Sequence, residues 1–388
     1  MTDTSRPIYL DHNASTPLLP EVRDAMLPYL GEHFGNPSSP HIYGRIMHDA
    51  VEQARIQVAT LIDCTPGEVF FTSGGTEANN LAIRGVAGAN PGRRHIVTSV
   101  IEHPAASGPC SFLEKQGYRV DRVPVDEMGR VEVPGILEAT SRNTLLITVM
   151  HANSETGALQ PIRQISEIAH ASGALVHTDA AQSLGKVDVS VQHEELDLLS
   201  LAGHKLYAPQ GVGALFVRSG IIIEPLIIGA GHEQGLRPGT ENVASIVGLG
   251  KACAIAQRDL AEESARVSDL RDRLWGRLAV QISGLAINGH PVDRLPNTLN
   301  VRFPGVSGNA LLAACTAIAA STGSACHEAG SSASEVILAM GVPDEEATGS
   351  VRLTLGRGNS RDDIDRAADE LIKAWQHLEK GSHGVRAV

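Results

Sequence analysis

Leu198-Leu-Ser-Leu-Ala-Gly-His-Lys205 is the stretch around which the rest of the chain is organised. It predicts a short apolar strand that follows Asp197 and is broken by Gly203, so that His204 and Lys205 stand just past the strand's end. A lysine there can lose part of its hydration, which lowers the pKa of its amine and frees it for a Schiff base. Taken alone, such a lysine is more often an ordinary surface residue. The other motifs of the chain decide whether Lys205 is a surface lysine or a reactive one.

Short apolar or β-branched runs alternate with helical patterns from Glu68 to about Phe216. This alternation predicts an α/β fold in which a mostly parallel sheet is covered by helices on both faces. Ligands of such sheets bind beyond the carboxyl ends of the strands. The strand-like runs are 69–72, 95–100, 119–123, 144–149, 174–179, 196–201 and 213–217.

A second, smaller domain is expected because 388 residues exceed what one hydrophobic core usually supports. A long helical pattern at 245–278 leaves the large domain, and strands at 297–303, 317–321 and 350–355 follow it, with helices near Asn309, Ser334 and Arg361. We expect a large domain over residues 15–255. Residues 1–14 and 256–388 would form the smaller α+β domain.

Composition excludes several classes of protein. The net charge is −12, acids and bases are mixed, and no basic tract is present, so nucleic acid is not an expected partner. The polar start and the lack of a long apolar run argue against a signal peptide or membrane span and predict a cytoplasmic protein. The cysteines have no metal-ligand spacing and indicate free thiols in a reducing compartment; they are Cys64, Cys110, Cys253, Cys315 and Cys326.

An anion site is expected at Ser73-Gly-Gly-Thr-Glu-Ala-Asn-Asn80, which follows a strand and opens a helix. Backbone N–H groups and the Thr76 hydroxyl would converge at the positive end of the helix dipole, where phosphate binds well. The same pattern also occurs as a simple tight turn and helix cap.

Two further residues follow strands. Asp179 ends an apolar run, where a buried carboxylate needs a cationic partner such as a protonated pyridine nitrogen. His103 is placed to stack on a flat cofactor and to move protons. Either residue alone is also an ordinary cap. Together with the anion site and Lys205, however, they describe a pocket for pyridoxal phosphate.

The chain resembles the class V, fold-type I cysteine desulfurases from about residue 8 to about residue 375. The resemblance implies their fold, a pyridoxal-phosphate-dependent transferase with a large domain and a smaller α+β domain. The motifs that carry it are Tyr9-Leu-Asp-His-Asn-Ala-Ser-Thr-Pro17, Gly35-Asn-Pro-Ser-Ser39, Thr72-Ser-Gly-Gly-Thr-Glu-Ala-Asn-Asn80, Glu102-His103, Asp179-Ala-Ala-Gln182, Gly203-His-Lys205, Arg237-Pro-Gly-Thr240 and Gly323-Ser-Ala-Cys326.

The resemblance implies roles around the cofactor, pyridoxal 5'-phosphate. Lys205 would be bonded to it, Asp179 would pair with the ring nitrogen, and His103 would stack on the ring. Gln182 and Ser154 would lie at the phenolic oxygen. Most relatives have Asn where this chain has Ser154, so the side chain would reach less far, and its hydrogen bond would be shorter in reach, mediated by water or absent.

The phosphate and the substrate have their own expected ligands. Gly75, Thr76 and His204 would hold the phosphate, and Thr240 would reach it from the other subunit of a homodimer. Many relatives also have a serine at the position of Ala202, so one phosphate hydroxyl is lost here. The expected substrate ligands are Arg357, whose guanidinium suits a carboxylate, and Asn36.

Cys326 lies in Ser324-Ala-Cys-His-Glu-Ala-Gly-Ser-Ser332, whose small polar residues predict a mobile loop. Such a loop suits a thiol that must visit the cofactor and deliver its cargo elsewhere, and His327 would favour the thiolate. The loop length resembles the long-loop branch of the family, and the Cys-His pair resembles the selenocysteine lyase branch.

The expected reaction converts L-cysteine to L-alanine and leaves a persulfide on Cys326, which passes the sulfur to an acceptor protein. Iron–sulfur cluster scaffolds, tRNA thiolation and other sulfur carriers are all possible routes, and the sequence predicts no resident metal. Alternatives are a selenocysteine lyase, an aminotransferase on the same fold, and a non-enzymatic scaffold with a degenerate pocket at Ser154 and Ala202.

Overall fold

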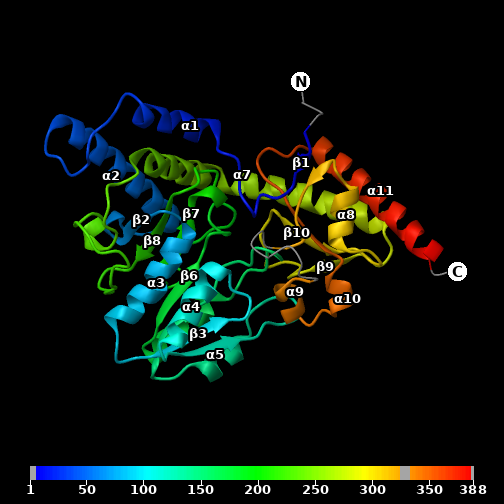
Figure 1. Cartoon of the computed structure of the whole chain (residues 1–388), viewed down its shortest axis with the longest axis horizontal. Helices are drawn as coiled ribbons and strands as arrows, with labels where there is room; N and C mark the ends of the chain where they lie inside the picture. Colours follow the sequence, from blue (N-terminus) through cyan, green and yellow to red (C-terminus); the bar gives the residue numbers. More distant parts are fainter. Residues whose placement is uncertain (1–5, 324–332, 386–388) are drawn as a thin grey trace.

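The computed structural model describes residues 6–323 and 333–385. Figure 1 shows two parts, a larger one around a central sheet and a smaller one that contains both ends of the described chain. Helix α7 (Val243–Gln281) crosses from the first part to the second. Its N-terminal half packs in the core of the large part and its C-terminal half in the core of the small part.

The described residues form a seven-stranded sheet in the order β2-β8-β7-β6-β5-β3-β4. β8 runs antiparallel to both of its neighbours, and the other pairs are parallel, which confirms a mostly parallel sheet. The strands are β2 (Val69–Thr72), β3 (His95–Ser99), β4 (Arg119–Val123), β5 (Thr144–Thr148), β6 (Leu175–Asp179), β7 (Leu198–Ala202) and β8 (Gly213–Val217).

Helices cover both faces of this sheet, because its strands are apolar on both sides. One core cluster joins the sheet to α1, α2, α6 and α7, and another joins it to α3 and α4. The helices of the large part before β7 are α1 (Pro20–Met26), α2 (Ile42–Ile62), α3 (Gly75–Ala89), α4 (Pro104–Lys115), α5 (Val133–Ala139) and α6 (Ile162–Ser172). Two single-turn 3₁₀ helices, η1 (Leu27–Leu30) and η2 (Pro66–Glu68), lie between them in the sequence.

The small part has its own core, in which Ile8 and Leu10 pack with residues from the C-terminal third of the chain. The first strand pairs in parallel with β11, so the start of the chain completes this part. Its elements are β1 (Ile8–Tyr9), β9 (Ala286–Asn288), β10 (Thr298–Arg302), α8 (Gly308–Ala314), β11 (Ile318–Ala319), α9 (Glu335–Ala339), α10 (Asp344–Ala347), β12 (Ser350–Thr354) and α11 (Arg361–Val385).

The strands expected from the sequence lie within about two residues of those observed. Three-residue β9 was not expected, because so short a run has no recognisable period. The expected domain boundaries stay a prediction, since α7 passes between the two cores without a break. Across residues 6–323 and 333–385, no helix has both the length and the apolar character that crossing a bilayer requires.

Candidate active site

Lys205 ends a single 3₁₀ turn, η3 (Gly203–Lys205), directly after β7. The turn packs tightly, because a Cβ added at Gly203 would lie 2.9 Å from the carbonyl oxygen of Val212. The Lys205 Nζ donates to the carbonyl oxygens of Asn13 at 2.6 Å and Ala14 at 2.8 Å. The segment after β1 therefore holds this amine at the carboxyl end of the sheet.

Asp179 ends β6, the parallel neighbour of β7, and is buried. Its Oδ2 accepts from Nδ2 of Asn79 at 2.7 Å, and its Oδ1 accepts from the backbone N–H of Ala181 at 2.9 Å. Both donors are neutral, so this buried carboxylate retains its need for a cationic partner. The Oδ1 of Asn79 is also buried, and no hydrogen-bond partner for it occurs within the described part of the chain.

The N-terminus of α3 lies beside the same two strands. Its first helical hydrogen bond runs from the N–H of Ala78 to the carbonyl of Gly74, so the N–H groups of residues 75–77 precede the helical ladder. Gly74 has a φ of 151°, which favours glycine. A Cβ added at Gly75 would lie 3.2 Å from the Cβ of Ala202, so helix and strand approach closely.

His103 is the N-cap of α4, and its Nδ1 accepts from the N–H of Ala105 at 3.1 Å. This bond assigns the proton of the neutral ring to Nε2. His204 lies near Lys205, and burial together with that lysine lowers the pKa of His204 to about 4. A neutral His204 offers a hydrogen bond to an anion without adding a charge.

Gln182 and Ser154 complete the wall of the site. The Nε2 of Gln182 donates to the carbonyl oxygen of Asn13 at 3.0 Å. The carbonyl oxygen of Ser154 accepts from Nδ2 of Asn13 and from Nη1 of Arg352, both at 3.1 Å. Asn13 thus connects residues from three separate parts of the chain.

These residues line one hollow of about 260 Å³. The structure therefore brings together every predicted cofactor residue except Thr240. The residues that line the hollow are Asn13, Ala14, Gly75, Thr76, Asn79, His103, Ala105, Met150, Ala152, Ser154, Asp179, Ala181, Gln182, Ala202, His204, Lys205 and Arg352.

Three described residues among those predicted, Thr240, Asn36 and Arg357, do not line the hollow. Thr240 and Asn36 are exposed on the surface. Cys326 lies outside the described residues. Arg357 lines a separate small cavity, and its Nη1 forms an ion pair with Asp259 at 2.7 Å. The placement of Arg357 therefore does not support the substrate role that the sequence assigned to it.

Arg352 stands where Arg357 was expected. It lies in β12, its side chain is 1% exposed, and its Nη2 contacts Asp11 Oδ1 at 2.7 Å. Its Nε is buried and has no hydrogen-bond partner within the described residues. An arginine inside the apolar run 350–355 is the sequence signal that could have identified it, since buried charges rarely occur without a function.

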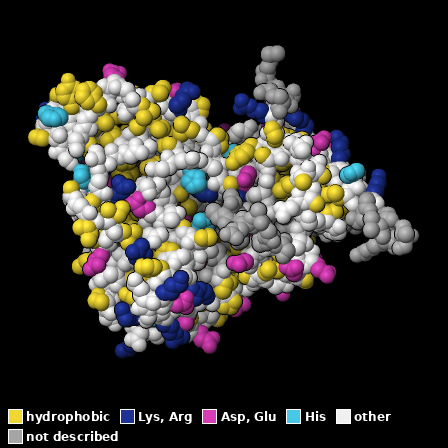
Figure 2. Space-filling model, viewed as in Figure 1, with side chains coloured by type: hydrophobic (Ala, Val, Ile, Leu, Met, Phe, Trp, Pro, Cys, Tyr) yellow, Lys and Arg dark blue, Asp and Glu magenta, His cyan; other side chains and the backbone are white. Residues whose placement is uncertain are grey.

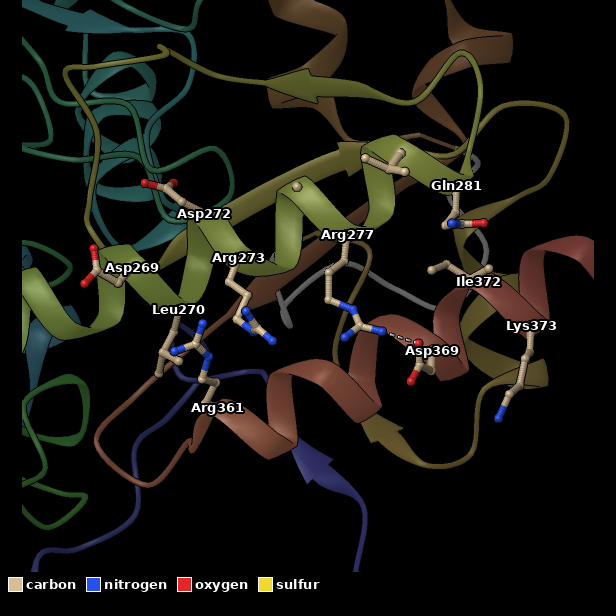
Figure 3. Close-up of a pocket in the computed structure, with 12 residues that line it drawn as sticks. Asp269, Leu270, Asp272, Arg273, Arg277, Gln281, Arg361, Asp369, Ile372 and Lys373 are labelled. Atoms are coloured by element: carbon tan, nitrogen blue, oxygen red, sulfur yellow. Dashed lines mark hydrogen bonds and ion pairs between the residues drawn. The ribbon is translucent and has the colours of Figure 1, made fainter.

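A second hollow, of about 880 Å³, lies between α7 and α11 on the small part (Figure 3). Arg273 and Arg277 on its wall form ion pairs with Asp365 and Asp369, so much of its charge is already neutralised within the chain. This groove shares no residue with the hollow around Lys205.

The hollow around Lys205 fits a flat anionic cofactor with a basic ring nitrogen. The N-terminus of α3 suits a phosphate, and the buried Asp179 suits a protonated nitrogen. Asn79 Oδ1 and Arg352 Nε, which have no hydrogen-bond partner in residues 6–323 and 333–385, belong to its lining residues. A carbonyl carbon beside Lys205 would be within reach of its amine.

Fold and site together define a class V aminotransferase: the model of the family Aminotransferase class-V matches residues 8–367, and the chain belongs to that family. Within it, the chain is 44% identical to cysteine desulfurase IscS 1 of Archaeoglobus fulgidus, over 95% of this chain and 97% of that protein. A solved NifS-like protein superposes with a TM-score of 0.90 at 34% identity, covering 96% of this chain and all of the other. The solved structure of SspA in complex with cysteine matches with a TM-score of 0.81 at 35% identity, over 90% of this chain and 99% of SspA.

Proposed function

We propose that this chain is a cysteine desulfurase that converts L-cysteine to L-alanine and leaves the sulfur as a persulfide on Cys326. The observation that carries the proposal is the convergence of the Lys205 amine, the buried Asp179 carboxylate and the α3 N-terminus on one hollow. Pyridoxal phosphate, when bound there, supplies an electron sink for the substrate carbon that loses its proton.

The chain's own residues would hold that cofactor at its charged ends. The N–H groups of Gly75 and Thr76, with His204, would bind the phosphate. Asp179, fixed by Asn79 and Ala181, would keep the ring nitrogen protonated. Ala202 offers no hydroxyl, so the phosphate depends more on backbone donors.

Lys205, whose amine lines the hollow, would take the Cα proton of the bound cysteine and return a proton to Cα when alanine forms. The Cys326 thiolate then attacks the substrate sulfur, a sulfur–sulfur bond forms, and the carbon–sulfur bond breaks. The electron pair of that bond stays on carbon, which gains a proton and becomes the methyl group of alanine. His103, whose ring proton is on Nε2, lines the same hollow and would exchange protons with the substrate.

The cysteines other than Cys326 are poor nucleophiles. Burial raises the pKa of Cys64, Cys110 and Cys253 to about 12 and that of Cys315 to about 11. At neutral pH these thiols stay protonated, and the thiolate is the reactive form. None of the four lines the hollow.

A homodimer would complete the site. Exposed apolar side chains gather where α1 and α2 lie, as Figure 2 shows at one end of the molecule. Thr240 lies three residues after Arg237. The Nε of Arg237 forms an ion pair with Oε1 of Glu77, in the first turn of α3, at 2.9 Å. Such a surface suits a second copy whose Thr240 reaches this phosphate site. The exposed apolar residues include Leu27, Leu30, Phe34, Ile42 and Tyr43.

The test combines the cofactor and the thiol. Purified protein should carry a yellow chromophore that Lys205→Ala abolishes, with a fall in turnover of about 10²–10⁴-fold. After treatment with cysteine, Cys326 should gain the mass of one sulfur, and alanine should form in equal amount. Selenocysteine, assayed in parallel, distinguishes a desulfurase from a selenocysteine lyase.

Cys64→Ser is the matched control and should keep both products. A Cys326→Ser variant that still released sulfide from cysteine at full rate would remove this thiol from the mechanism. A keto acid in place of alanine would identify an aminotransferase instead.

A further inference from the structure

Lys186 lies on the turn after β6, four residues beyond Gln182, and its ammonium group contacts two residues that line the cofactor hollow. Its Nζ contacts Oε1 of Gln182 at 3.1 Å and Oδ1 of Asn13 at 3.4 Å. Both partners are neutral amide oxygens. Among the described residues, no carboxylate forms an ion pair with this ammonium, and the residue is half-buried. A half-buried ammonium that contacts only neutral oxygens loses part of its hydration without gaining a counter-ion, which points to a use.

The contacts of Lys186 fix the orientation of the Gln182 amide. Oε1 faces the Lys186 ammonium, while Nε2 donates to the carbonyl oxygen of Asn13 at 3.0 Å. The flipped amide would place an NH₂ group against an ammonium and an oxygen against a carbonyl oxygen, and both contacts are repulsive. Gln182 lines the hollow, so its second N–H is the donor that it can offer to an anionic oxygen there.

Lys186 also belongs to a group of three cations. Burial is the largest cause that lowers the pKa of Lys186, to about 7, and the charges of Lys205 and Arg352 lower it further. The interaction is mutual, so a charged Lys186 also disfavours a proton on Lys205. Its charge contributes in the same way to the lowered pKa of His204. On its outer side Lys186 shares a small cavity with Glu263 and Arg357, which are paired with Arg266 and Asp259.

We propose that Lys186 is a positioning residue of the cofactor site: it holds the Gln182 amide with a donor toward the pocket and places a positive charge behind the Lys205 amine. The proposal rests on the proposed function, because it needs a cofactor bonded to Lys205. An anionic oxygen in the pocket would in turn favour the charged form of Lys186. The chain thereby lowers the proton affinity of the Lys205 nitrogen without any residue that touches the substrate.

The test is a spectrophotometric pH titration of the chromophore in the purified holoenzyme, without substrate. Lys186→Met should raise the titration midpoint by about one pH unit, as expected for removing one nearby positive charge. Lys186→Arg keeps the charge and should restore the midpoint to near the wild-type value. Lys373→Met, which removes an exposed lysine paired with Glu370, should leave it unchanged.

Lys186→Gln serves as a second variant if the methionine variant does not fold, because it keeps a donor and removes only the charge. Midpoints that stay equal to wild type in folded, chromophore-bearing Lys186→Met or Lys186→Gln protein would overturn the proposal. A shift in Lys186→Arg as large as in Lys186→Met would also overturn it, since packing would then be the cause. A wild-type protein without any chromophore would instead refute the proposed function itself.

Discussion

Two arginines five residues apart have opposite environments. Arg352 is buried in β12, lines the hollow around Lys205 and contacts Asp11. Arg357 lies beyond the strand and is neutralised by Asp259, which is also paired with Arg258. Both arginines are paired with an aspartate, but a guanidinium that binds a substrate carboxylate must also face the site with an unused donor. Arg352 lines the hollow, and its Nε has no hydrogen-bond partner among the described residues.

We therefore expect Arg352→Gln to raise the KM for cysteine by about 10–10²-fold, because a charge-assisted hydrogen bond contributes about 1.5–3 kcal/mol. Steady-state kinetics on folded, chromophore-bearing enzyme would measure this. Arg357→Gln is the matched control and should change KM by less than about threefold. The reverse ranking of the two variants would return the substrate role to Arg357.

At the scale of elements, α2 and α7 approach each other through small residues. A Cβ added at Gly250 in α7 would lie 2.6 Å from the Cα of Ala54 in α2, and backbone atoms cannot give way. Gly276 lies in the same helix, but its Cβ would meet no atom within 4 Å. The two glycines thus have different reasons to occur in one helix.

Gly250→Ala should lower the free energy of unfolding by about 1–3 kcal/mol, through overpacking between α2 and α7. Gly276→Ala should raise it by about 0.5–1 kcal/mol, because alanine loses less entropy in a helix. Urea denaturation followed by circular dichroism measures both. Equal effects of the same sign would contradict the close packing at Gly250.

At the scale of the whole molecule, buried histidines make stability depend on pH. Burial lowers the pKa of His12, His151 and His177 to about 4, from an ordinary value of 6.5. Between these values the unfolded chain binds more protons than the folded one. Their contribution to stability is complete above pH 6.5 and declines as the pH falls toward 4.

The urea concentration at the unfolding midpoint should therefore decrease as the pH is lowered from 7 to 5. Each histidine would lower the free energy of unfolding by up to about 1.4 kcal/mol per pH unit. His151→Leu should make this decline shallower, because one proton-binding difference is removed. If the midpoint declined with pH equally steeply in wild type and variant, groups other than His151 would cause the acid sensitivity.

The proposed dimer gives a second prediction at this scale. Ile42 is 55% exposed and is the first residue of α2, where an aspartate favours the helix dipole. Ile42→Asp should fold but weaken association at least about tenfold, since it places a charge in an apolar interface. Light scattering with size-exclusion chromatography measures this. Val292→Asp, at a residue 78% exposed on the small part, should leave association unchanged.

The sequence determined much of the fold, because the apolar runs of the large sheet are strong local signals and end at residues with chemical meaning. Asp179 and Lys205 could be placed at the carboxyl ends of neighbouring strands from pattern alone, and their motifs carried the family resemblance. The choice between Arg352 and Arg357 was missed this way: the apolar run around Arg352 signalled a buried arginine, but only the structure shows which side chain lines the hollow.

Tertiary structure alone decided which distant residues meet. Asn13, 192 positions before Lys205, supplies the carbonyl that holds its amine, and Asn79 holds Asp179 across 100 positions. Lys186 acquired significance only when its ammonium proved to contact both Gln182 and Asn13. Local sequence encodes where each strand and helix begins and ends. Burial, distance and charge coupling between far parts of the chain arise only when those elements pack.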